Sequence, residues 1–172
     1  MLEYKFKLLI AGEPGAGKTE IANAADACLP LRPFGVSISK KFDATLDVNC
    51  NLTLMIWTLS ERRPKDTTFY TGSDGAIIVC NLEKWSTISK MIKWADSIKS
   101  NLGDVPLFFI GNNYDLADPD HINLLKKIAK SYDSPWYYIN YEDKDEVKEV
   151  FNSVARKLLK LKDVDPDAID NY

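Results

Sequence analysis

The sequence predicts a three-layer α/β/α fold built on a six-stranded, mixed but mostly parallel sheet with about five helices. Three observations support this class. Short apolar runs alternate along the chain with longer segments of helical periodicity. Two runs, GAIIVCN at 75–81 and VPLFFI at 105–110, are apolar without interruption, which is typical of strands covered on both faces. A glycine-rich loop at 12–17 separates the first apolar run from the first helical segment.

The strands are predicted from short apolar segments bounded by turn residues. They span 4–11, 37–48, 52–59, 75–81, 105–110 and 134–139. The segment 37–48 partly alternates between polar and apolar residues, as a strand with one covered face does. The short link at 49–51 predicts an antiparallel hairpin with the next strand. The other strands are separated by helices and should pair in parallel.

The helices are predicted from apolar residues at helical spacing. They span 18–27, 85–102, 118–129 and 143–161. The second has an apolar stripe from Ile88 to Ile98, and the last has the longest stripe. Asp118 can cap the third helix, and Pro119 suits its first turn. Because ligands of such folds bind outside the carboxyl ends of the strands, the loops there should line one crevice.

Composition and charge exclude several classes of protein. The chain has 172 residues, 45% hydrophobic and 27% charged, which suits one well-packed domain. A net charge of −3 argues against a nucleic-acid partner. Three cysteines without disulfide or metal-ligand spacing favour the cytoplasm. No lipid anchor is visible, so peripheral contact with membranes should come through a partner. We assign 1–162 to the domain and 163–172, with four aspartates, to an acidic C-terminal tail.

Residues 12–19, GEPGAGKT, match G-x-x-x-x-G-K-[ST] in full, between a predicted strand and a predicted helix. Glycines let the backbone wrap closely around phosphate oxygens, and the following helix start favours an anion. Lys18 should contact the β- and γ-phosphates of a nucleoside triphosphate, and the Thr19 hydroxyl should coordinate Mg²⁺. The predicted phosphate-binding residues are Pro14, Gly15, Ala16, Gly17, Lys18, Thr19 and Glu20.

The segment 111–116, GNNYDL, follows the fifth predicted strand. A carboxylate at a strand end can accept two parallel hydrogen bonds from the N1–H and exocyclic amine of guanine. Adenine has no such pair of donors, so Asp115 would select guanine. An ordinary turn rich in Asn and Asp is the alternative, and the phosphate loop on the same sheet favours guanine recognition.

With both motifs identified, the chain resembles a Ras-like small GTPase, the Rab branch above all, over nearly its whole length. The resemblance rests on LLIAGEPGAGKT, LTLMIW, FYTGSDGAIIVCNLEKWSTISKMIKW, FFIGNNYDL and DEVKEVFNSVARKLL. It implies a P-loop NTPase fold, a GTP/GDP switch, and Mg²⁺ bound with GTP or GDP. It also implies protein regulators and effectors that contact 29–42 and 58–73.

The resemblance assigns the guanine site to Asn112, Asn113, Asp115, Tyr141 and Glu142. Asn112 and Asp115 match the family motif. Asn113 stands where the family has a lysine whose stem covers the base and whose amine braces the phosphate loop, so affinity should fall while selectivity survives. The backbone amide of Tyr141 should contact the base. Glu142 replaces a second family lysine.

The first switch of the family carries a threonine that closes over magnesium. Anchoring on Gly35–Val36 puts Pro33 there, and counting from the phosphate loop puts Ser37 there. Ser37 or Ser39 could offer a hydroxyl, and we assign Ser37 as the second metal ligand. The two prolines of LPLRPF at 29–34 predict a stiff loop.

The second switch departs most from the family. In the family, the strand that corresponds to 52–59 of this chain leads into the motif W-D-T-A-G-Q-E. Thr58 replaces the aspartate when no gap is allowed, and with one deletion Glu61 takes the place of the catalytic glutamine. In either alignment the aspartate is lost, which should weaken magnesium binding. Two functions therefore remain open: a GTPase switch with slow hydrolysis, with Glu61 as its catalytic residue, and a GTP-binding pseudo-GTPase scaffold that hydrolyses little or nothing.

Overall fold

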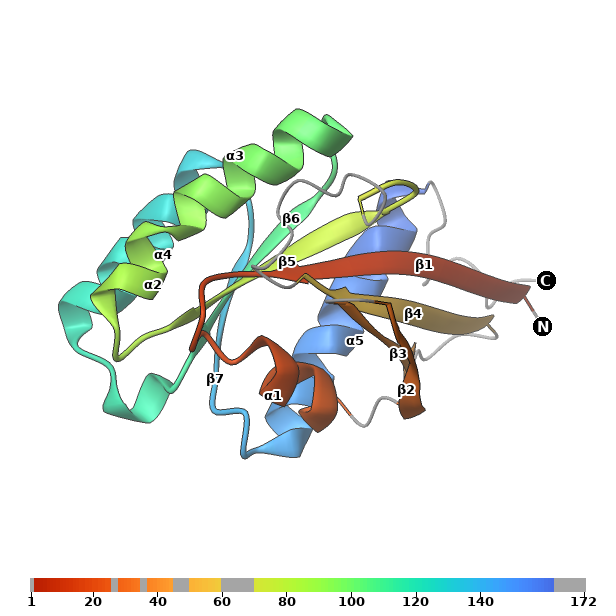
Figure 1. The fold of residues 1–172 in the computed structure, drawn as a ribbon, viewed down its shortest axis with the longest axis horizontal. Coiled ribbons are helices and arrows are strands. Elements are labelled where there is room, and N and C mark those ends of the chain that lie inside the picture. Colours follow the sequence, from red (N-terminus) through yellow and green to blue (C-terminus); the bar gives the residue numbers. More distant parts are fainter. Residues whose placement is uncertain (1, 26–27, 35–36, 45–49, 60–69, 163–172) are drawn as a thin grey trace.

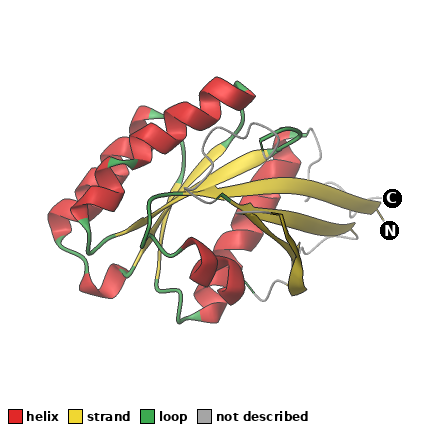
Figure 2. Cartoon of the chain, in the orientation of Figure 1, coloured by secondary structure: helices red, strands yellow, loops and turns green. Residues whose placement is uncertain are grey.

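The computed structural model describes residues 2–25, 28–34, 37–44, 50–59 and 70–162, with side-chain surroundings for 4–25, 52–59 and 70–162. The described residues form a three-layer α/β/α domain, as predicted (Figure 1). Helices lie on both faces of one twisted sheet, and the two helical layers are seen apart from the strands in Figure 2.

Within the described ranges the sheet has seven strands in the order β2-β3-β4-β1-β5-β6-β7. Their bounds are β1 Leu2–Ala11, β2 Cys28–Phe34, β3 Ser37–Ala44, β4 Cys50–Thr58, β5 Gly75–Asn81, β6 Leu107–Asn112 and β7 Trp136–Ile139. The five strands β4, β1, β5, β6 and β7, which are neighbours in this order, pair in parallel. Strands β3 and β4 form the predicted antiparallel hairpin, and β2 adds a second antiparallel pair.

The seventh strand corrects two predictions, the strand number and the loop at 29–34. Strand β2 pairs with β3 at Cys28–Lys41, Leu31–Ser39 and Phe34–Ser37, and the register shifts between these pairs. A proline lacks the N–H that a central strand needs, but an edge strand leaves one row of backbone groups unpaired. Pro30 and Pro33 are therefore compatible with a strand at the end of the sheet.

Five α-helices occur in the described residues: α1 Lys18–Ala24, α2 Trp85–Ser89, α3 Met91–Leu102, α4 Pro119–Ser131 and α5 Lys144–Leu161. The single helix predicted over 85–102 is wrong, because α2 ends at Ser89 and α3 begins at Met91, with Lys90 as the cap residue between them. The apolar stripe continues through the break, which is why the pattern concealed it. Asp118 and Asp143 accept hydrogen bonds from the first turns of α4 and α5, and the first of these caps was predicted.

The core lies in two layers, one on each face of the sheet. Residues of β1 alternate between them: Leu8 and Ile10 pack toward α1 and α5, whereas Leu9 and Ala11 pack toward α3 and α4. All seven residues of β5 and all six of β6 are buried, as expected of strands covered on both faces. This burial fixes the carboxyl ends of β1, β5 and β6 at one edge, where the site lies.

No helix in the described ranges is long and apolar enough to cross a membrane.

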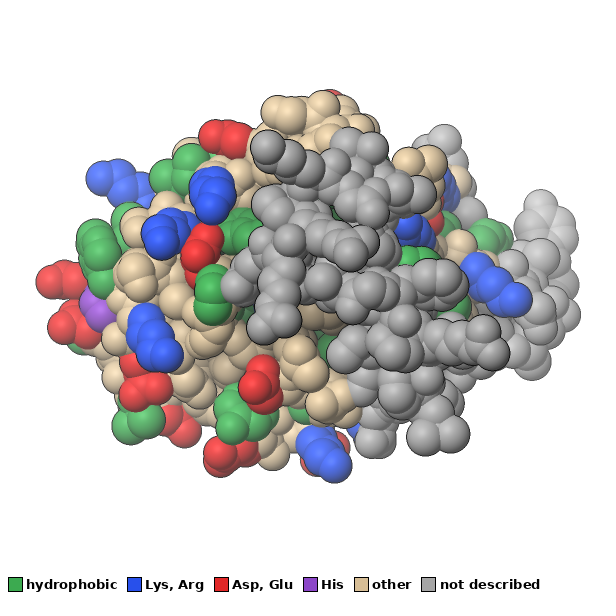
Figure 3. Space-filling view, viewed as in Figure 1, with side chains coloured by type: hydrophobic (Ala, Val, Ile, Leu, Met, Phe, Trp, Pro, Cys, Tyr) green, Lys and Arg blue, Asp and Glu red, His purple; other side chains and the backbone are tan. Residues whose placement is uncertain are grey.

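The single histidine of the chain, His121, lies 5.5 Å from the ring of Trp85, measured between centroids. Trp85 is 52% exposed. The space-filling view shows this histidine at the left edge among hydrophobic and acidic side chains (Figure 3).

Candidate functional site

The phosphate loop connects β1 to α1, as predicted, and its glycines adopt backbone angles that side chains disfavour. Gly12, Gly15 and Gly17 have φ values of 150°, 78° and 99°. A Cβ at Gly12 would lie 2.4 Å from the carbonyl oxygen of Val79, so no larger residue fits beside β5. The loop is thus packed against the sheet on one side and opens to solvent at Pro14 and Gly15.

The loop leaves hydrogen-bond donors at its end. The helical ladder of α1 begins with the bond from Ile21 N to Gly17 O (2.9 Å), so the amides of the first turn precede it. Lys18 Nζ donates to Gly12 O, which holds the ammonium over the loop. Thr19 and Glu20 are exposed in the same turn. This arrangement of amides and an ammonium is suited to an anionic ligand.

Glu13 anchors the loop to α3. Its carboxylate accepts a hydrogen bond from Trp94 Nε1 (Oε1 to Nε1, 3.0 Å) and lies 3.8 Å from the ammonium groups of both Lys90 and Lys93. Trp94 is buried, and its ring centroid lies 5.6 Å from Lys18 Nζ. One tryptophan therefore contacts both ends of the phosphate loop. This contact was not predicted from the sequence.

The segment 111–116, predicted to recognise guanine and called the guanine loop below, lies at the end of β6, which β5 separates from β1. Asn112 is the last residue of β6 and is buried, whereas Asp115 is exposed in a short 3₁₀ turn, Tyr114–Leu116. Asn112 Oδ1 accepts from the backbone N–H of Tyr141 (3.1 Å), and the Asp115 N–H donates to Asn140 Oδ1 (3.3 Å). These bonds tie the loop after β6 to the loop after β7. The Tyr141 amide orients Asn112, and its contact with a base stays a prediction.

Asn81, at the end of β5, joins the guanine loop to the phosphate loop. Its Oδ1 accepts from Asn113 Nδ2 (3.0 Å), and its Nδ2 donates to Gly15 O (3.4 Å). Asn113 Nδ2 also donates to Glu83 Oε2 (3.1 Å). Asn113 has φ 60°, a left-handed conformation that asparagine tolerates. Two short amides thus connect the loops at the position where the family lysine was expected to act.

Carboxylates gather on the outer side of the guanine loop. Burial raises the pKa of Glu146, in the first turn of α5, and the charge of Asp143 raises it further; Asp115 adds a smaller effect. A hydrogen bond with the backbone of Asn140 opposes these effects. Glu142 lies exposed in the loop between β7 and α5. This acidic surrounding favours a ligand edge that carries hydrogen-bond donors, as guanine does.

The residues predicted near the metal lie on the other side of the phosphate loop from the guanine loop, at the ends of β4 and β3. Thr58 ends β4 and is buried, paired in the sheet with Ile10 of β1 and Ile38 of β3. Ser37 begins β3 next to Ile38, so the topology brings this residue to the sheet edge where the phosphate loop starts. Glu61, the predicted catalytic residue, lies outside the described residues.

Asn81 and Asn140, which organise the guanine loop, were not among the site residues predicted from the sequence. Both follow or end a predicted strand at the binding edge, so the strand-end rule that pointed to Asp115 could have found them. Among the described residues, the predicted phosphate residues follow β1 and the predicted guanine residues follow the neighbouring strands β6 and β7, with β5 between the two groups.

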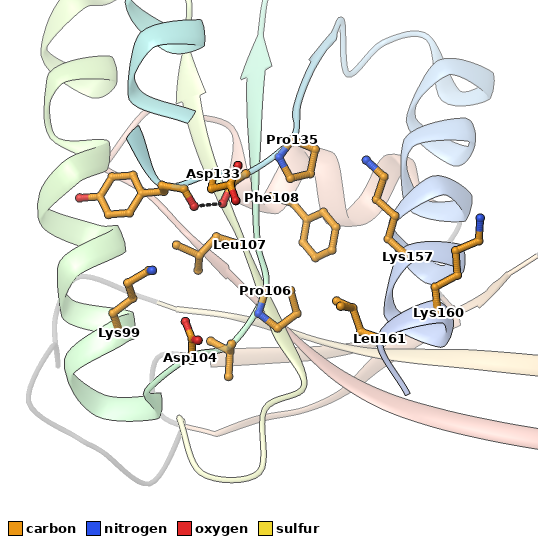
Figure 4. A pocket seen from close by; sticks show the side chains of 13 residues that line it. Lys99, Asp104, Pro106, Leu107, Phe108, Asp133, Pro135, Lys157, Lys160 and Leu161 are labelled. Atoms are coloured by element: carbon orange, nitrogen blue, oxygen red, sulfur yellow. Dashed lines mark hydrogen bonds between the residues drawn. The ribbon is translucent and has the colours of Figure 1, made fainter. Parts of the chain in front are cut away.

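A cavity of about 610 Å³ lies elsewhere, at the amino ends of β6 and β7. Its floor includes Pro106 and Phe108, and Lys99 of α3 faces Lys157 and Lys160 of α5 across it (Figure 4). None of the predicted site residues lines it. It is therefore separate from the phosphate and guanine loops.

Comparison with known proteins decides the family. The model of the Ras family matches residues 51–160. The chain belongs to the Ras family. The sequence is similar to Ras-related protein Rab-13 of Canis lupus familiaris (25% identical; 91% of this chain, 81% of the relative), GTP-binding protein ypt1 of Schizosaccharomyces pombe (24%; 91% and 81%) and Ras-related protein Rab-21 of Homo sapiens (23%; 98% and 78%).

These relatives confirm the resemblance to the Rab branch of small GTPases. The family match begins at Asn51, so it spans β4 to α5 and includes the guanine loop. The phosphate loop precedes the matched residues, and the alignment with Rab-21, which spans 98% of the chain, includes it. Family membership therefore rests on evidence that is independent of the phosphate-loop motif.

Proposed function

We propose that this Ras-family protein binds guanine nucleotides and acts as a GTP/GDP switch with slow intrinsic hydrolysis. The observation that carries the proposal is the linkage of two loops by Asn81, which sets the phosphate loop beside the guanine loop at one sheet edge. Lys18 and the first-turn amides of α1 would bind phosphate. Asn112, Asn113, Asp115, Tyr141 and Glu142 would surround the base.

The residues present suit a magnesium ion bound together with the nucleotide. Thr19 is exposed beside the phosphate loop, and Ser37 begins β3 at the same edge. Among the described residues no group of three or more His, Cys, Asp or Glu is placed to hold a metal. Magnesium commonly takes few protein ligands together with substrate phosphates, so Thr19 and Ser37 would hold it. When bound, it would neutralise charge on the phosphates.

A scaffold that binds GTP without hydrolysing it is the second candidate. The buried Thr58 at the end of β4 favours it, because a hydroxyl cannot replace the negative charge that the family aspartate places beside the metal's water ligands. Glu61 would be the catalytic residue of a working GTPase, and its charge would face a triphosphate, which disfavours binding in the ground state. Regulators and effectors would contact 29–42 and 58–73 in both cases.

The test begins with the nucleotide that co-purifies with the protein. We expect GDP or GTP in equimolar amount, and displacement by guanine nucleotides at concentrations where ATP has no effect. A folded protein that binds neither GDP nor GTP, or binds ATP equally well, would refute guanine recognition.

Single-turnover hydrolysis then separates the two candidates. Protein loaded with GTP and magnesium should release phosphate above the enzyme-free background, and Glu61→Ala should abolish the excess. Intact GTP after hours, in the presence of magnesium, would favour the scaffold.

A further inference from the structure

Lys84 lies in the turn between β5 and α2, and its backbone is held from both sides. Its N–H donates to Asn81 O (2.9 Å), and its carbonyl accepts from both N (3.0 Å) and Oγ1 (2.8 Å) of Thr87. The Thr87 hydroxyl also bonds to the backbone of Asn81. This turn therefore starts the side chain of Lys84 from a fixed point beside the phosphate loop.

The ammonium of Lys84 lies over Gly15. A Cβ built on Gly15 would come within 3.1 Å of Lys84 Nζ. Gly15 is the residue whose carbonyl accepts the bond from Asn81, so both groups meet the loop at the same point. Lys18 holds the other end of the loop through Gly12 O. Two ammonium groups from different segments therefore bracket the phosphate loop.

The charge of Lys84 is not neutralised within the part of the chain that the structure describes. The neighbouring carboxylate of Glu83 accepts from Asn113, and the carboxylate of Glu13 accepts from Trp94 and faces Lys90 and Lys93. No described acidic side chain forms an ion pair with Lys84 itself. The arrangement leaves positive charge directed at the loop that would receive an anion.

We propose that Lys84 is a phosphate-binding residue of this site, supplying the ammonium at the junction of the two loops that the shorter Asn113 cannot supply. The inference rests on the proposed nucleotide binding and deepens it. Its ligand is the phosphate chain of a guanine nucleotide, and its contribution is electrostatic, because a partly solvated lysine acts as a point charge.

The charge predicts the size of the effect. An ammonium group attracts a nearby phosphate group by a Coulomb interaction that weakens with distance and with the surrounding dielectric constant. Exposure of the lysine reduces this, as for surface ion pairs. We expect Lys84→Met to raise the Kd for GDP about fivefold at low salt, with a smaller effect at high salt. Lys84→Arg should bind within about twofold of the wild type, since it keeps the charge.

The experiment measures Kd for GDP and for guanosine by competition against a fluorescent GDP, at two salt concentrations. Lys127→Met is the matched control, because Lys127 is an exposed lysine on α4 away from the loops. Guanosine has no phosphate, so its Kd should be unchanged in Lys84→Met. A second variant, Asn113→Lys, places a lysine at the family position, and Lys84→Met should cost less in that background.

The outcomes separate this inference from the proposed function. If the wild type binds GDP and Lys84→Met binds it equally well at low salt, the role of Lys84 is refuted and nucleotide binding stands. If Lys84→Met weakens guanosine as much as GDP, the residue holds the loops rather than phosphate, which also refutes it. A folded wild type that binds no guanine nucleotide refutes both.

Discussion

Removing the Glu13 carboxylate should destabilise the protein through one partly buried hydrogen bond rather than through its ion pairs. The Trp94 indole is 5% exposed and donates to Glu13 at 3.0 Å. A hydrogen bond to a charged acceptor contributes about 1.5–3 kcal/mol, and a buried donor left unpaired costs a similar amount. Lys90 and Lys93 lie 3.8 Å away with side chains 55% and 73% exposed, so each pair should contribute roughly 0–1 kcal/mol.

Glu13→Ala should therefore lose about 2–3 kcal/mol of unfolding free energy. Glu13→Gln keeps an oxygen acceptor and should lose about 1 kcal/mol or less. For a chain of this size, 1 kcal/mol moves the melting temperature by about 2–4 °C, so Glu13→Ala should melt roughly 4–12 °C lower. Trp94→Phe removes the donor, and its effect should be non-additive with that of Glu13→Ala.

The assay is equilibrium urea unfolding followed by far-ultraviolet circular dichroism, which does not depend on tryptophan fluorescence. It is run without nucleotide and at one fixed GDP concentration, because a bound ligand adds its own stabilisation. Glu149→Ala, an exposed acid on α5, serves as the control and should change stability by less than about 0.5 kcal/mol. Equal losses for Glu13→Ala and Glu13→Gln would show that charge, not the indole bond, stabilises the loop, and would refute the reasoning.

Three further predictions concern the guanine loop, the phosphate loop and the opposite face. Asp115→Asn should shift binding from guanine toward xanthine nucleotides, measured by competition; unchanged preference would contradict the assignment of Asp115. Gly17→Ala should abolish GDP binding in titration calorimetry while the protein stays folded, because its Cβ would lie 2.6 Å from Asn112 Nδ2 and φ is 99°; normal affinity would disprove the close contact. Burial, with a hydrogen bond to Asp96, raises the pKa of Tyr132 to about 12, so the folded state holds this proton more tightly than the unfolded chain. The stability that Tyr132 adds over Tyr132→Phe should be complete below about pH 10 and lost between about pH 10 and 12. A difference that stays constant in urea unfolding across this range would refute the shift.

The sheet core was predictable because its signal is local. Uninterrupted apolar runs identified β5 and β6, since burial on both faces leaves a pattern within a few residues. The antiparallel pairing of β3 with β4 was predicted correctly, but the link predicted at 49–51 was misplaced, because Cys50 and Asn51 belong to β4. The strand β2 was not predictable in this way. LPLRPF carries two prolines, and only its place at the sheet edge, which depends on the whole topology, makes them acceptable.

The break between α2 and α3 shows a second limit. Ile88, Met91, Ala95 and Ile98 lie on one buried stripe whether the helix is continuous or broken at Lys90. The side chain of Lys90 does not cap either helix, so the residue type gave no signal that a helix ends there. Periodicity reports which face is buried, and it does not report where the backbone bonds are interrupted.

For the site, the sequence predicted which loops meet, and it could not predict how they are joined. The strand-end rule placed the phosphate and guanine loops at one edge. The chain of amides from Asn113 through Asn81 to Gly15 depends on distances between residues 32 and 66 positions apart. No pattern within a single segment encodes those distances.

Two questions about this protein, its nucleotide selectivity and its rate of hydrolysis, concern strands on opposite sides of β1 in the sheet. The guanine loop follows β6 and is braced by β5 and β7, whereas Thr58 and Ser37 belong to β4 and β3 on the other side of β1. Only the phosphate loop, at the end of β1, borders both. The loss of the family aspartate at β4 should therefore affect magnesium geometry and turnover without reaching the residues that would recognise guanine. For this reason nucleotide selectivity and hydrolysis should vary independently in this chain, and a failure to hydrolyse GTP would not count against its binding.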